Sequence, residues 1–226
     1  MDDPLTIATA HLAEIEALPV KNTPNERVVH RKLARELSHA KPDFVLAVAR
    51  ELHRLSDEPG HAYALLSYHK PTFDTLGEVE IQEFGQGINS WWTVDGFARS
   101  LAGPAWLRQQ ISDEVIHTWA RSEDRWWRRA ALVSTVALNI RSKGGYGDVR
   151  RTLEVCEMLA DDQDDMVIKA LSWALRALVV HDPDVVRGFL AEHDDLLAAR
   201  VKREVTNKLT TGLKNPRRHA PRGTAS

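Results

Sequence analysis

The spacing of apolar residues strongly constrains the fold class of this chain. Apolar side chains recur every three or four positions almost throughout, for example in residues 133–140 and again in residues 167–178. That period places one apolar face along a helix. The alternation of apolar and polar residues that marks a half-buried strand is nearly missing. The sequence therefore predicts an all-α protein.

Helix start signals divide the chain into short segments. Thr23 precedes a proline and is expected to cap a helix, Pro42 and Asp182-Pro183 open others, and Gly103-Pro104 is expected to begin a long one. We predict roughly ten to twelve helices of about 10–18 residues joined by short loops. Pairs of helices return about every 35–45 residues, which is the spacing of HEAT-type repeats that stack into a curved solenoid.

Composition and length indicate an ordinary globular protein of one domain. The 226 residues are 43% hydrophobic and 27% charged, and no stretch reaches the length of a membrane helix. The first twenty residues are acidic and lack the features of a secretory signal. Cys156 is the single cysteine, so no internal disulfide is possible. We expect a cytoplasmic protein, a monomer, with no membrane partner.

The net charge of −2 hides two basic segments. Residues 121–151 hold eight Lys and Arg against three acids, and residues 200–226 hold eight against one. A local basic patch matters more for nucleic-acid binding than the total. The plainer interpretation is a solvated face followed by a disordered basic tail, which we place at residues 214–226 after a domain spanning residues 1–213.

Common catalytic motifs are not found. The chain has no Walker-type phosphate loop, no G-x-S-x-G elbow, no CxxC and no HExxH. The ten histidines are dispersed and lack the spacing of a helical zinc site. We predict neither a metal nor a cofactor.

Seven tryptophans are the unusual feature, and two pairs of them are adjacent in sequence: Trp91-Trp92 and Trp126-Trp127. Neighbours on a helix point about 100° apart, so at least one member of each pair must leave the core. Trp91 and Asp95 are four positions apart and share a face if Ser90 opens a helix. The plainer alternative is a core tryptophan beside a solvated aspartate.

Three segments resemble known sequence motifs. Residues 84–95 resemble the signature FG…I-x-[NS]-W-D-x-V-D, residues 119–132 the stretch W…S-x-[ND]-x-W-x-x-R-x-A-x-L, and residues 168–176 the stretch I-x-K-A-[IL]-x-W-x-L-R. In these motifs the chain resembles the AlkD-type DNA alkylation-repair glycosylases. Residues 182–186 and 202–205 follow in the family's order. Position 92 departs from the signature, because Trp92 stands where the family usually has Asp.

The resemblance implies a right-handed superhelical solenoid of HEAT-like repeats that holds duplex DNA in its concave face. By that resemblance Asp95 is the catalytic carboxylate, Trp91 and Trp173 face the lesion, and Arg129 grips the backbone nearby. The implied reaction is hydrolysis of the N-glycosidic bond of cationic alkylpurines such as 3-methyladenine and 7-methylguanine, the first step of base excision repair. We expect further DNA contacts from four basic residues: Arg125, Arg128, Lys202 and Arg203.

Three functions remain open from the sequence. A glycosylase requires Trp91, Asp95 and Trp173 to converge on one concave surface with Arg129 nearby. A non-catalytic protein that binds distorted or branched DNA requires only a basic concave face. A protein-interaction scaffold predicts an Asp95 held in a salt bridge and tryptophans that are buried. Simple core packing is the plainer interpretation of Trp173, and a surface salt bridge that of Arg128 or Arg129.

Overall fold

The computed structural model describes residues 2–216 of the chain, and within that range it is helical with no strand. These residues form fourteen α-helices, one π-helical segment η1 (Ala98–Ala102) and one 3-10 turn η2 (Arg141–Lys143). The α-helices are α1 (Pro4–Glu16), α2 (Thr23–Glu36), α3 (Pro42–Leu55), α4 (Gly60–Tyr68), α5 (Lys70–Phe73), α6 (Glu78–Phe84), α7 (Trp91–Phe97), α8 (Gly103–Leu107), α9 (Asp113–Ala120), α10 (Arg125–Leu138), α11 (Val149–Met158), α12 (Asp165–Leu178), α13 (Pro183–Glu192) and α14 (Ala199–Thr211).

The all-α prediction is confirmed, although the helices are shorter and more numerous than expected. Two of the expected starts need correction. The side chain that caps α2 belongs to Asn22, which accepts a hydrogen bond from the Asn25 amide, so Thr23 is already the first helical residue. Gly103-Pro104 opens only the five residues of α8, which continue directly from η1. The starts at Pro42 and at Asp182-Pro183 are found as predicted.

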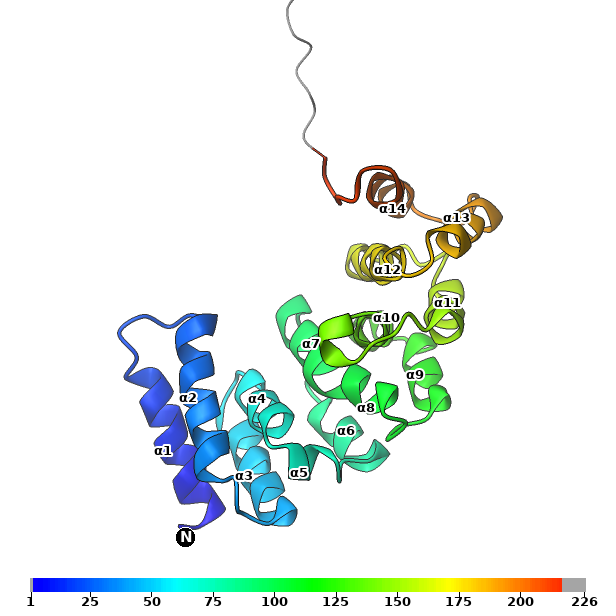
Figure 1. Cartoon of the computed structure of the whole chain (residues 1–226). Coiled ribbons are helices and arrows are strands. Elements are labelled where there is room, and N and C mark those ends of the chain that lie inside the picture. Colours follow the sequence, from blue (N-terminus) through cyan, green and yellow to red (C-terminus); the bar gives the residue numbers. More distant parts are fainter. Residues whose placement is uncertain (1, 217–226) are drawn as a thin grey trace, which may run out of the picture.

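The helices follow an arc from α1 and α2 at one end to α14 at the other (Figure 1). One row of helices packs in the order α2, α4, α7, α10, α12 and α14, and each member contacts the next. A second row includes α1 against α3 and α9 against α11. The fold is therefore a helical repeat stack in two layers. Its HEAT-like character and right-handed twist stay predictions.

One hydrophobic core runs along this stack from Ala8 to Val205. Helix α10 lies at its centre, with every residue from Arg129 to Leu138 buried. Gly103 lets another helix come close to it, because a Cβ there would lie 2.6 Å from the Ser134 carbonyl oxygen. The position of α10 matters for function, since it carries Arg129.

The domain boundary at residue 213 stays a prediction, and residues 217–226 of the expected tail lie outside the described residues. Across residues 2–216, no helix combines the length and the apolar character needed to span a bilayer.

Candidate active site

Helix α7 presents Trp91 and Asp95 one turn apart. Ser90 caps it, because the Ser90 hydroxyl accepts from the Thr93 amide at 3.2 Å while the Thr93 hydroxyl accepts from the Ser90 amide at 3.2 Å. This reciprocal cap fixes where the helix begins. The expected start at Ser90 is thus present, and with it the shared face of Trp91 and Asp95.

The Asp95 carboxylate is held by a guanidinium. Arg129 donates from Nε to one carboxylate oxygen and from Nη2 to the other, both at 2.9 Å, and from Nη1 to the Met166 carbonyl oxygen at 2.6 Å. Arg129 is only 5% exposed. Its contacts make it a positioning residue for Asp95, and its predicted grip on the DNA backbone stays a prediction.

The tryptophans of α7 lie outside the core. Trp91 and Trp92 are each 53% exposed and meet edge to face, with ring centroids 5.7 Å apart. Trp173 on α12 is half-buried, and the guanidinium of Arg99 lies over its ring, 5.5 Å from the centroid. Indole faces that are open to solvent are available for stacking and for contact with a cation.

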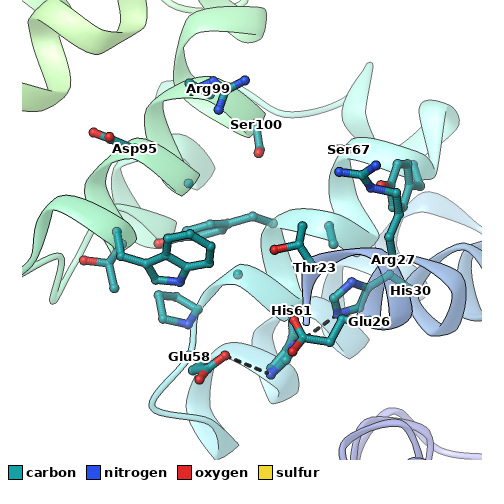
Figure 2. A pocket seen from close by; sticks show the side chains of 18 of the residues that line it. Thr23, Glu26, Arg27, His30, Glu58, His61, Ser67, Asp95, Arg99 and Ser100 are labelled. Atoms are coloured by element: carbon teal, nitrogen blue, oxygen red, sulfur yellow. Dashed lines mark hydrogen bonds and ion pairs between the residues drawn. The ribbon is translucent and has the colours of Figure 1, made fainter. Parts of the chain in front are cut away.

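These residues converge on one groove of about 730 Å³. Trp91, Asp95 and Trp173 all line it, and Trp91, Trp173 and Arg129 also line an adjoining hollow of about 460 Å³. Figure 2 shows one wall with Asp95, Arg99 and Ser100, and the facing wall with Arg27, His30 and Glu58. The convergence that a glycosylase requires is therefore present. The scaffold hypothesis required an ion-paired Asp95 and buried tryptophans; the ion pair is present, but at the groove Trp91 is 53% exposed and Trp173 is only half-buried.

The four other basic residues expected to bind DNA, Arg125, Arg128, Lys202 and Arg203, do not line either hollow. Arg125 pairs with Asp164 at 3.3 Å, Arg128 with Asp162 at 2.7 Å, and Lys202 with Asp194 at 3.1 Å. Arg203 is exposed on α14. Their contact with DNA stays a prediction.

Other cations supply the charge of the groove. It is lined by Arg27, Arg31, Arg99 and Lys143, none of which forms an ion pair with a carboxylate of residues 2–216. Arg27, Arg31 and Arg99 lie outside the two basic segments of the sequence, and Lys143 lies within the first of them. The number of Lys and Arg in a segment does not reveal which side chains face the groove.

Three buried histidines meet beside the groove, on the side of α2 and α4. His30 Nε2 lies 3.0 Å from His61 Nδ1, and the His11 ring centroid lies 5.3 Å from that of His30. Burial lowers the pKa of all three, to about 4 for His11 and about 3 for His30. This cluster was not foreseen from sequence. Among the described residues, no group of three or more His, Cys, Asp or Glu has a geometry that would hold a metal ion.

Comparison with known proteins places the chain in a family. The model of the family described as DNA alkylation repair enzyme matches residues 10–209. A search of curated proteins found no match. The family match begins well before residue 84, where the first of the three motif segments starts, so it also covers helices α2 to α6. The chain thus belongs to the DNA alkylation repair enzyme family, and its general function is the repair of alkylated DNA, with DNA as its partner.

Proposed function

We propose that this protein is a DNA N-glycosylase that releases cationic alkylpurines, such as 3-methyladenine and 7-methylguanine, from duplex DNA. The observation that carries the proposal is the Asp95 carboxylate, fixed on both oxygens by Arg129, in a groove shared with the rings of Trp91 and Trp173. The product would enter base excision repair.

The proposed reaction breaks the bond between C1′ of the deoxyribose and the ring nitrogen of the base. The electron pair of that bond goes to the base, which already carries a positive charge and leaves neutral without a general acid. The sugar is left as an oxocarbenium-like cation, as in glycoside hydrolysis. Water then adds to C1′ and releases a proton, so that the products are a free base and an abasic site.

This transition state is stabilised by a negative charge held close to the sugar, and the Asp95 carboxylate can supply that charge. A carboxylate has about four lone-pair positions, and Arg129 occupies one on each oxygen. The others remain to face the cationic sugar and to orient a water. Since Arg129 fixes the carboxylate in advance, little reorganisation is needed during the reaction.

The indole faces suit the charge of the damaged base. A cation over an aromatic ring gains about 0.5–2 kcal/mol, depending on how far it is desolvated. The contact of Arg99 with Trp173 is an example of a cation on one of these rings. A neutral undamaged purine lacks this attraction and is also a poorer leaving group, which gives two reasons for selectivity.

The test is release of the two methylated bases from methylated duplex DNA by purified protein, beside Asp95→Asn. The isosteric amide removes the charge, and we expect release to fall by about 10²–10³-fold, the range for loss of one electrostatic stabiliser. Asp74→Asn is the matched control, because Asp74 is an exposed ion-paired carboxylate that does not line the groove. DNA binding without release by the wild-type protein would instead establish a non-catalytic DNA-binding protein.

A further inference from the structure

Two cations lie together beside Asp95 without a carboxylate partner. Arg99 belongs to η1, which follows α7 directly, and Lys143 ends η2. The Lys143 ammonium donates a hydrogen bond to the Arg99 carbonyl oxygen at 2.8 Å. Neither side chain forms an ion pair with any carboxylate in residues 2–216.

The local fold holds this pair in place. Segment η1 is π-helical, and π-helical turns recur at functional sites. Within it, Arg99 lies over the Trp173 ring, whereas the Asp95 carboxylate is paired with Arg129. Burial and the neighbouring charge of Arg99 lower the pKa of Lys143. Two like charges at close range are costly unless an anion joins them.

The two walls of the groove differ in charge. On the α2 side, Arg27 and Arg31 share the surface with the acidic residues Glu26 and Glu58. On the α7 side the carboxylate of Asp95 is neutralised by Arg129, so the charges of Arg99 and Lys143 are left uncompensated. Figure 2 shows Arg99 on the same wall as Asp95. The positive potential of the groove is therefore concentrated beside the candidate catalytic carboxylate.

We propose that Arg99 and Lys143 together bind one phosphate group of the DNA strand that carries the damaged base. An arginine fork and a lysine point charge are both common phosphate ligands. Arg99 follows Asp95 by about one turn, so a phosphate held there belongs to the strand whose sugar faces Asp95. The stack of Arg99 on Trp173 links this phosphate contact to a ring that faces the base. The inference rests on the proposed function, since it names how the same groove holds its substrate.

The test measures binding to a duplex with a tetrahydrofuran abasic site, by fluorescence anisotropy across a range of salt concentrations. Loss of one phosphate contact lowers the slope of log K against log salt by about 0.9. We expect that reduction from the double variant Arg99→Gln/Lys143→Gln. Arg54→Gln/Arg108→Gln is the control with equal loss of charge, because both arginines are exposed, ion-paired and outside the groove. An equal slope in the two double variants would overturn the proposal.

A second experiment identifies which phosphate of the duplex the two residues contact. Neutral methylphosphonate linkages are placed one at a time next to the abasic site, on either strand. At one position on the damaged strand, the wild-type protein should lose the affinity that the double variant has already lost, and the variant should lose nothing more. Equal losses by both proteins at every position would contradict a shared phosphate. If the double variant proves unstable, Lys143→Gln serves alone, because the hydrogen bond of the Lys143 ammonium goes to one carbonyl oxygen.

The results of these two binding experiments can be distinguished from the result of the glycosylase test. If the wild-type protein releases no base but the slope falls as expected, the proposed function fails and the phosphate site stands. If base is released and Asp95→Asn abolishes it, while the slope is unchanged in the Arg99 and Lys143 variants, the site fails and the glycosylase stands.

Discussion

Asp95 and Arg129, 34 positions apart in the sequence, form a two-pronged ion pair with both N···O distances at 2.9 Å. The pair joins α7 to α10, and a third hydrogen bond from Arg129 to the Met166 carbonyl oxygen extends it to α12. Three consecutive helices of the row from α2 to α14 are thus tied together at the residue that the proposed reaction depends on. A structural contact and a catalytic requirement coincide here, and they can be separated by experiment.

Arg129→Lys should retain the charge but lose the fork, because an ammonium cannot match both carboxylate oxygens and the Met166 carbonyl. Misplacing a catalytic group by about 1 Å costs about 10²-fold, and we expect base release to fall by that order. The measurement is single-turnover release of 7-methylguanine. Arg151→Lys is the matched control, since Arg151 is also 5% exposed and binds Asp148 and the Trp106 carbonyl. Equal losses of activity in both variants would show that Arg129 acts only through stability.

Trp91→Ala should lower the rate of release of cationic bases by about 2–30-fold, the equivalent of a cation–π contact of about 0.5–2 kcal/mol. Trp92→Ala should lower it less, because Trp91 lines both hollows and Trp92 only the larger. Each side chain is 53% exposed, so thermal unfolding should change little in either variant. A larger loss from Trp92→Ala would reverse the assignment and make position 92 the main contact with the lesion.

Gly103→Ala should destabilise the fold, because the new Cβ would lie 2.6 Å from the Ser134 carbonyl oxygen and 2.7 Å from the Ala137 Cβ. Forcing a methyl group into a packed contact costs about 1–3 kcal/mol of unfolding free energy. Urea unfolding measures it. Gly188→Ala is the control, because α13 has open space around Gly188, and alanine there should stabilise the helix by up to about 1 kcal/mol. If Gly103→Ala left the free energy of unfolding unchanged, the contact of η1 and α8 with α10 could widen without loss of stability.

Stability should fall as the solution is acidified below pH 6.5. His11 and His30 have pKa values lowered to about 4 and about 3, mainly by burial, so between these values and 6.5 the unfolded chain binds more protons than the folded one. The free energy of unfolding then rises with pH across that window and levels off above it. A pKa difference of one unit is worth about 1.4 kcal/mol, so each histidine removes on the order of 2 kcal/mol by pH 5.

The groups that face this cluster include the acids Glu14, Glu16, Glu26 and Glu58, which favour protonation, and Lys32, which opposes it. Urea unfolding at pH 7.5 and pH 5, with His30→Gln beside the wild-type protein, measures the effect. The variant should lose less stability between the two pH values than the wild-type protein does. Equal losses would place the acid sensitivity elsewhere.

Local sequence determined the class of fold and one arrangement within the site. The period at which apolar residues recur determines which face of each helix is buried, so the all-α prediction needed no tertiary information. The spacing of Ser90, Trp91 and Asp95 sets a cap and a shared face within one short helix, and these are present. Both results depend on residues within a turn or two of each other, where backbone geometry alone fixes the arrangement.

The tertiary structure decided which distant residues meet. Only the packing of α7 on α10 brings Arg129 to Asp95, and only the packing of α1, α2 and α4 gathers His11, His30 and His61. It also decided that Arg99 and Lys143, rather than Arg125 and Arg128, line the groove. The sequence shows how many charged residues a segment carries. The direction in which their side chains point depends on how each helix is rotated against its neighbours. That rotation is determined by the burial of apolar faces along the whole stack.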